Sequence, residues 1–156
     1  MMVQLRFALA RCAPLLAALC LGCADIAPAP PIATPDRMAF DSLVWPILVR
    51  DCGFSACHGA ESRFFRVLGP GHERLVPTMR LGEPVTAEEL QLSYDRARSM
   101  LDAADPDASP LLLKPLEVAA GGSGHEGTDR FGRDVYHSVD DPSFQVLVRW
   151  AHGALP

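Results

Sequence analysis

The sequence predicts a small all-α domain, residues 38–156, with long loops rich in glycine and proline. Apolar residues recur at helical spacing in residues 38–51, 87–103 and 142–152, as on the buried face of an amphipathic helix. The segments between them contain clustered Gly and Pro, which favours turns and loops. A length of 156 residues, with 49% hydrophobic and 21% charged residues, fits one globular domain.

The first predicted helix, residues 38–51, runs directly into a cysteine motif. Pro46 interrupts it, because the proline ring removes a backbone donor and restricts Trp45. We expect either a short turn to residue 45 followed by a helix with Pro46 in its first turn, or one kinked helix. The apolar positions of this stretch are Phe40, Leu43, Val44, Ile47 and Leu48.

The second predicted helix has the clearest start signal. Thr86 and Glu89 form a capping box, which predicts a helix from residue 87 to about Ala103. A short helix at residues 111–114 should follow, opened by Pro110 and ended by Pro115. The apolar face of the longer helix consists of Leu90, Tyr94, Ala97 and Leu101, with Met100 beside it.

The last predicted helix begins after Asp141, which caps it, with Pro142 in the first turn. Gly153 should end it. We expect Trp150 to flank a buried stripe made of Phe144, Leu147, Val148 and Ala151.

Residues 1–22 are typical of an export signal. Arg6 and Arg11 form its basic end, residues 13–21 form a short apolar run, and residues 19–23 resemble a bacterial lipobox. The apolar run is shorter than the roughly 20 residues that span a bilayer. We expect acylation at Cys23; a soluble secreted protein cut nearby and an uncleaved anchor are the alternatives. Residues 23–37, rich in Pro and Ala, should form an extended tether.

These features predict an exported protein of the cell envelope, attached to a membrane through its lipid anchor and facing the periplasm or the outside. Loss of Arg6 and Arg11 with the signal changes the formal net charge from −5 to −7. Such an acidic chain is an unlikely ligand of nucleic acid, and its single lysine, Lys114, provides no basic face for anionic lipid.

A cysteine motif, residues 52–59, carries the strongest chemical signal. Cys52 and Cys57 are followed at once by His58, and two cysteine thioethers with an adjacent histidine hold a c-type haem. The usual spacing has two residues between the cysteines, whereas this chain has four. A plain Cys52–Cys57 disulfide is a second interpretation. A zinc site that adds a distant histidine is a third, although no second ligand pair completes it.

Candidates for a second iron ligand lie in the loops. Glycines surround His125 in residues 117–134, and glycine lets a backbone approach a flat ligand closely. Met79 and His72 occupy the loop of residues 61–84, and Met100 adjoins an apolar helix face. For each residue the alternative is ordinary: packing for the methionines and a solvated side chain for the histidines.

The order of these parts resembles the small single-haem cytochrome c domain. More narrowly, residues 40–59, 106–114, the His125 loop and residues 148–154 are similar to cytochrome c-like domains on exported lipoproteins of myxobacteria and planctomycetes. The resemblance covers residues 38–154 and implies that the first and last helices cross. It also implies that Cys52 and Cys57 are the thioether residues of one covalent haem c, with His58, before Gly59, as the proximal iron ligand.

The family often has a Met-Pro-Pro segment that supplies the sixth ligand, and this chain lacks it. His125 stands in that region instead, so we expect bis-histidine ligation, with Met79 or Met100 as alternatives. The resemblance implies a lipid-anchored electron carrier with an unidentified redox protein as partner, and no enzymatic activity. A non-haem structural lipoprotein closed by a Cys52–Cys57 disulfide is the second hypothesis. A haem peroxidase is the third, although no convincing acid or base set accompanies the motif.

Overall fold

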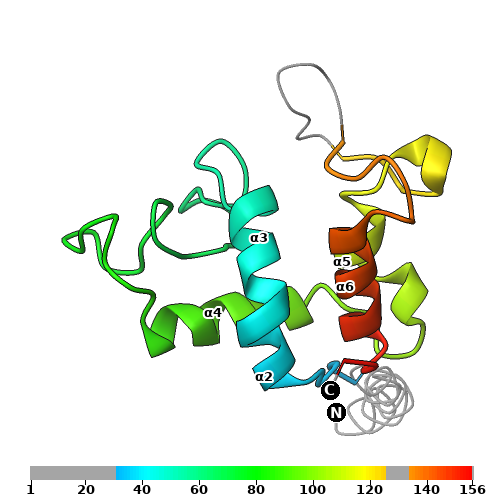
Figure 1. The fold of residues 1–156 in the computed structure, drawn as a ribbon, viewed down its shortest axis with the longest axis horizontal. Coiled ribbons are helices and arrows are strands. Elements are labelled where there is room, and N and C mark those ends of the chain that lie inside the picture. Colours follow the sequence, from blue (N-terminus) through cyan, green and yellow to red (C-terminus); the bar gives the residue numbers. More distant parts are fainter. Residues whose placement is uncertain (1–30, 126–133, 156) are drawn as a thin grey trace, which may run out of the picture. The chain divides into compact units, whose positions relative to one another are not determined.

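The computed structural model describes residues 31–125 and 134–155. Within these residues the structure is helical, and its only strand-like pairing is an isolated parallel bridge between Leu116 and Tyr136. The helical segments include α2 (Arg37–Ala39), a π-helix (Phe40–Val44), α3 (Trp45–Cys52), α4 (Ala87–Arg98), α5 (Pro110–Leu113) and α6 (Pro142–Ala151), shown in Figure 1. Two 3₁₀ turns, Pro106–Ala108 and Val118–Ala120, flank α5. The predicted all-α class is confirmed for the part of the chain that is described.

The predicted signal and most of the predicted tether, with Cys23, lie outside the described residues. Within residues 31–125 and 134–155, no helix is long and apolar enough to cross a membrane. Pro35 and Asp36, at the end of the predicted tether, dock on the folded domain. The carbonyl of Pro35 accepts a hydrogen bond from the Tyr94 hydroxyl at 2.8 Å, and that of Asp36 accepts one from the Trp150 indole at 2.9 Å.

The first helical stretch is continuous, although Pro46 lies inside it. Asp36 caps it with its side chain, and the π-helix Phe40–Val44 leads directly into α3. The backbone N–H of Trp45 bonds the carbonyl of Phe40 in the π pattern. Pro46 falls in the first turn of α3, where its missing N–H is tolerated. Both sequence alternatives therefore hold in part: Pro46 opens α3, and a π-helix rather than a break precedes it.

The core is built on three aromatic rings. The Phe40 ring lies 5.3 Å from both the Tyr94 ring and the Trp150 ring, measured between centroids. These rings join the π-helix to α4 and α6, and all three residues are buried. Trp150 is 0% exposed, so the expectation that it flanks the stripe of α6 is wrong. Its large ring reaches the centre of the core, whereas Val148 is only partly buried.

Helix α4 is shorter than predicted, because it ends at Arg98 rather than near Ala103. The N–H groups of Met100 and Leu101 bond carbonyls only three residues back, which tightens the chain into turns. Met100 also accepts a bond at its carbonyl from the N–H of Leu111 at 3.0 Å. This bond ties the end of α4 to α5, so the chain leaves the helix early.

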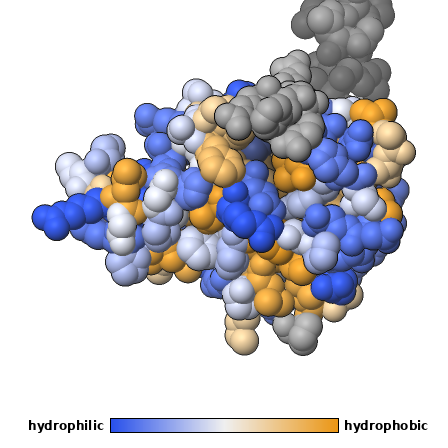
Figure 2. Space-filling model, turned by 45° about the horizontal axis from the view of Figure 1, so that its top comes forward, coloured by the Kyte–Doolittle hydropathy of each residue, from blue (hydrophilic) through white to orange (hydrophobic). Residues whose placement is uncertain are grey.

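The surface keeps several large apolar side chains exposed, among them Met38, Phe64 and Leu81. They belong to different segments, and Figure 2 shows apolar and hydrophilic residues intermixed on the face it presents.

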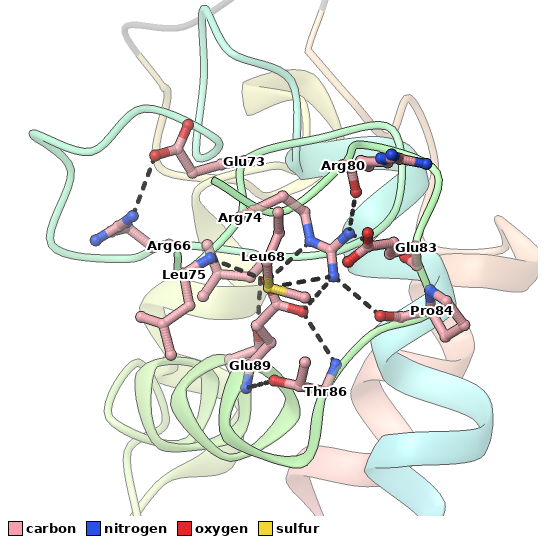
Figure 3. Close-up of polar contacts among 12 residues, drawn as sticks. Arg66, Leu68, Glu73, Arg74, Leu75, Arg80, Glu83, Pro84, Thr86 and Glu89 are labelled. Carbon is pink, nitrogen blue, oxygen red and sulfur yellow. Dashed lines mark hydrogen bonds and ion pairs between the residues drawn. The ribbon is translucent and has the colours of Figure 1, made fainter. Parts of the chain in front are cut away.

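A buried ion pair organises the loop before α4 (Figure 3). The Arg74 guanidinium meets both carboxylate oxygens of Glu89 at 2.9 Å, and the two side chains are 3% and 0% exposed. Glu89 also accepts bonds from the backbone N–H groups of Leu75 and Thr86. The Arg74 guanidinium donates to the carbonyls of Arg80, Glu83 and Pro84. The capping box was predicted, but its glutamate also anchors the whole loop.

We expect Glu89→Gln to destabilise the domain at pH 7 by about 3 kcal/mol, because it leaves the buried Arg74 guanidinium without its counter-charge. The hydrogen bond from Arg74 lowers the pKa of Glu89 from 4.5 to about 2. The unfolded chain therefore takes up a proton first, and the wild type loses stability as the pH falls from about 4.5 towards 2. Urea unfolding at several pH values should show the two proteins converging in acid. Glu88→Gln, an exposed neighbour, should track the wild type; equal loss in both variants would contradict this account.

Candidate functional site

The four residues between Cys52 and Cys57 form a compact turn. The N–H groups of Cys57 and Gly59 bond the carbonyl of Phe54 at 2.8 and 2.9 Å, and the N–H of His58 bonds the carbonyl of Cys52 at 3.0 Å. Gly59 is required by this turn, since a Cβ there would lie 2.1 Å from the carbonyl oxygen of Gly53. The bulge expected from the long spacing is thus a closed, hydrogen-bonded loop at the end of α3.

His58 is held by its own hydrogen bond. Its Nδ1 lies 3.0 Å from the carbonyl oxygen of Phe65, and because a carbonyl only accepts, Nδ1 carries the proton. The Nε2 atom is then the one with a lone pair, as in metal-bound histidines whose other nitrogen donates to a carbonyl. Burial lowers the pKa of His58, the bond to Phe65 opposes this, and His125 and Arg63 lower it further. The imidazole is therefore kept neutral, the form that binds a metal.

A cavity of about 110 Å³ adjoins this histidine. Its wall comes from the end of α3, the cysteine motif, α5, α6 and the loops around them. The lining residues that matter below are Cys52, Cys57, His58, Phe65, Met100, Lys114 and His125, with Leu48, Leu111 and Leu147 as apolar wall. A second, more open hollow shares Cys57, His58, Lys114 and His125 with it.

His125 also lines this cavity, although it lies far from His58 in the sequence. Its ring centroid lies 5.8 Å from that of His58, with 37° between the ring planes. Two imidazoles that bind one metal ion on opposite sides, with metal–nitrogen bonds of about 2 Å, hold their centroids roughly 6 Å apart. The two rings are thus close enough to share one metal ion, and the two cysteines line the same cavity.

The other candidate ligands are placed differently. Met100 lines the cavity. Met79 does not, and its sulfur lies 3.9 Å from the Arg74 guanidinium in the loop before α4. His72 contacts the motif from behind, with its Nδ1 2.9 Å from the carbonyl oxygen of Gly53 and its ring against Phe54. Of the candidates for a second ligand, only His125 and Met100 therefore border the cavity.

The two cysteines of the described residues are free thiols, and their surroundings differ. Cys52 is 8% exposed. Burial, and then the charges of Asp51 and Cys57, raise the pKa of the Cys52 thiol to about 12. Cys57 is half-buried, so it is the more accessible of the two.

A polar cluster beside Cys52 could not be predicted from the motif. The Asp51 carboxylate accepts bonds from Arg50 at 2.6 and 2.7 Å and from the Tyr136 hydroxyl at 3.0 Å. Arg50 also donates to Ser143 in the first turn of α6. Burial raises the pKa of Tyr136, with added contributions from Cys52 and Asp51. Tyr136 is distant in sequence, and only the fold brings it to α3.

Within residues 31–125 and 134–155, no three His, Cys, Asp or Glu side chains converge as ligands of a bare metal ion. The zinc site considered from the sequence therefore has no complete ligand set among these residues. Comparison of the chain with protein-family models, with curated proteins and with solved structures finds no match.

We expect a thiol-alkylating reagent at pH 8 to modify Cys57 much faster than Cys52 in the reduced, folded, haem-free protein. The thiolate is the reactive form, and burial with a pKa of about 12 keeps Cys52 protonated and shielded. Peptide mass mapping after short exposure measures the ratio. In urea the two cysteines should react at comparable rates, and equal rates in the folded protein would contradict the structure.

Proposed function

We propose that this chain is an exported c-type cytochrome that carries electrons through one covalently attached haem, and that it is not an enzyme. The observation that carries the proposal is the facing pair of imidazoles, His58 and His125, in a cavity whose wall contains Cys52 and Cys57. A disulfide alone needs neither histidine in that position. The packing of the first helical stretch against α6 through Phe40 and Trp150 supports the proposal, because the resemblance implies contact between the first and last helices.

Four residues that line the cavity would hold the haem. Cys52 and Cys57 would hold the group through thioethers, while His58 and His125 would bind its iron. When bound, haem supplies an iron that cycles between the ferrous and ferric states. The hydrogen bond from His58 Nδ1 to Phe65 would orient the proximal ring and raise its basicity. A second imidazole in place of methionine should give a low reduction potential, because Met/His ligation raises it.

The proposed location rests on the N-terminal pattern. The export signal of residues 1–22 and acylation at Cys23 would anchor the carrier to a membrane, with its domain in the periplasm or outside the cell. Its redox partner would be another protein. The compartment would be oxidising, and there a disulfide could also persist.

The alternative function is a non-haem structural or interaction lipoprotein with a Cys52–Cys57 disulfide. One observation favours it: the N–H of His58 bonds the carbonyl of Cys52 at 3.0 Å, which keeps Cys57 near Cys52. The turn between them is also closed by the bonds from the N–H groups of Cys57 and Gly59 to the carbonyl of Phe54.

The deciding experiment expresses residues 24–156 with a periplasmic signal in a host that attaches haem. We expect an intact mass higher by one haem after denaturation, and a c-type band in the pyridine haemochrome spectrum. Cys57→Ala should lower the yield of attached haem, since one thioether is lost. A colourless protein that is lighter by two hydrogens would establish the disulfide alternative instead.

The ligand set is tested in the haem-loaded protein. We expect His125→Ala to convert a six-coordinate, low-spin iron to a high-spin form, because the distal imidazole is lost. His137→Ala removes an exposed histidine outside the cavity and should leave the spectrum unchanged. A methionine-to-iron charge-transfer band near the red end of the spectrum in the wild type would instead assign the sixth position to Met100, the methionine that lines the cavity.

A further inference from the structure

Residues 122–124, which precede His125 and are called the arm below, each make a hydrogen bond to an earlier part of the chain. The N–H of Gly122 bonds the carbonyl of Glu117 at 3.0 Å, and the N–H of Ser123 bonds the carbonyl of Leu113 at 2.9 Å. The Lys114 ammonium donates to the carbonyl of Gly124 at 3.3 Å. The three residues that precede His125 are therefore each attached to residues 113–117, which are the last residue of α5 and the segment that follows it.

Gly122 is the tightest point of this arm. A Cβ at this position would lie 1.8 Å from the carbonyl oxygen of Leu116 and 3.0 Å from that of Leu113. Both neighbours are backbone, so no flexible side chain can move aside. Any larger residue must push the arm away from residues 113–116, and His125 is three residues further along.

The segment that the arm packs on is itself fixed to α3. The N–H of Glu117 bonds the carbonyl of Tyr136, and the N–H of Tyr136 bonds the carbonyl of Pro115, each at 2.9 Å. The Tyr136 hydroxyl then donates to Asp51, the residue before Cys52. Hydrogen bonds thus run from the cysteine motif through Tyr136 to residues 115–117, and from there to the arm.

We propose that residues 113–124 form a preassembled support that positions His125 opposite His58 before any ligand enters the cavity, with Gly122 as the positioning residue. The use of this geometry for iron rests on the proposed function, whereas the placement of the ring does not. Preorganisation of this kind lowers the cost of ordering a ligating side chain when a ligand binds. The support would therefore set how firmly the second imidazole holds its position against competing ligands.

The first test uses the full chain in haem-free, reduced form. We expect a nuclear Overhauser contact between the imidazole protons of His58 and His125 in the wild type, because the rings are 5.8 Å apart. Gly122→Ala should lose this contact while urea unfolding stays cooperative. Gly82→Ala is the matched control, since a Cβ there meets nothing within 4 Å. A contact that persists in Gly122→Ala, or is absent from the wild type, would overturn the proposal.

The second test uses the haem-loaded chain. Gly122→Ala leaves the cysteine motif intact, so haem should attach as before, but the six-coordinate fraction should fall. The apparent affinity for added imidazole should rise roughly tenfold, since a misplaced ring competes poorly; Gly82→Ala should match the wild type. Unchanged imidazole affinity in Gly122→Ala would overturn the proposal.

A chain that takes no haem would refute the proposed function alone, because the haem-free test would still decide the placement of His125. Were Gly122→Ala unable to fold, Lys114→Met would take its place in both tests. This variant removes the ammonium bond to Gly124, together with one positive charge of the cavity wall, and keeps an apolar stem, so we expect a weaker contact and a smaller rise in imidazole affinity. No change in either measurement would count against the support.

Discussion

The contact between Phe40, Tyr94 and Trp150 is the constraint on which the remaining structure depends. It joins the π-helix, α4 and α6 at one point. The π-helix leads directly into α3, and α3 and α6 both contribute to the wall of the cavity. Aromatic pairs at such separations contribute beyond the area they bury. The Tyr94 hydroxyl and the Trp150 indole also hold Pro35 and Asp36 in place, which fixes where the folded domain begins.

Much of the helical framework was predictable because its signals are local. The capping box of Thr86 and Glu89, and the cap of Asp141 with Pro142, placed the starts of α4 and α6. The end of α4 was not predictable, since it depends on the bond between Met100 and Leu111 in a different element. The same holds for Trp150. Helical periodicity predicts which face of α6 is buried, but only the contact with the Phe40 ring shows that Trp150 lies at the centre of that face.

The candidate site divides in the same way. Short motifs and local composition, which a sequence displays directly, predict four candidate ligands: Cys52, Cys57, His58 and His125. The bond from His58 to Phe65, the anchoring of Asp51 by Tyr136 and the close approach of Gly122 to Leu116 join positions with no shared local pattern. The same holds for Arg74, which lies well before the helix whose cap it completes. Such partners become visible only when the chain is folded.

The π-helix Phe40–Val44 changes the angular position of every residue that follows it in the first helical stretch. A π turn contains one residue more than an α turn, and each residue of a helix rotates the chain by about 100°. The aromatic contact at Phe40 is made by the first residue of this π-helix, whereas Cys52 lies beyond it at the end of α3. The direction in which the motif leaves α3 is therefore set relative to the core by one inserted residue. Loss or gain of a single residue between these points would turn the cysteines to another face, even if every side chain of the cavity were kept.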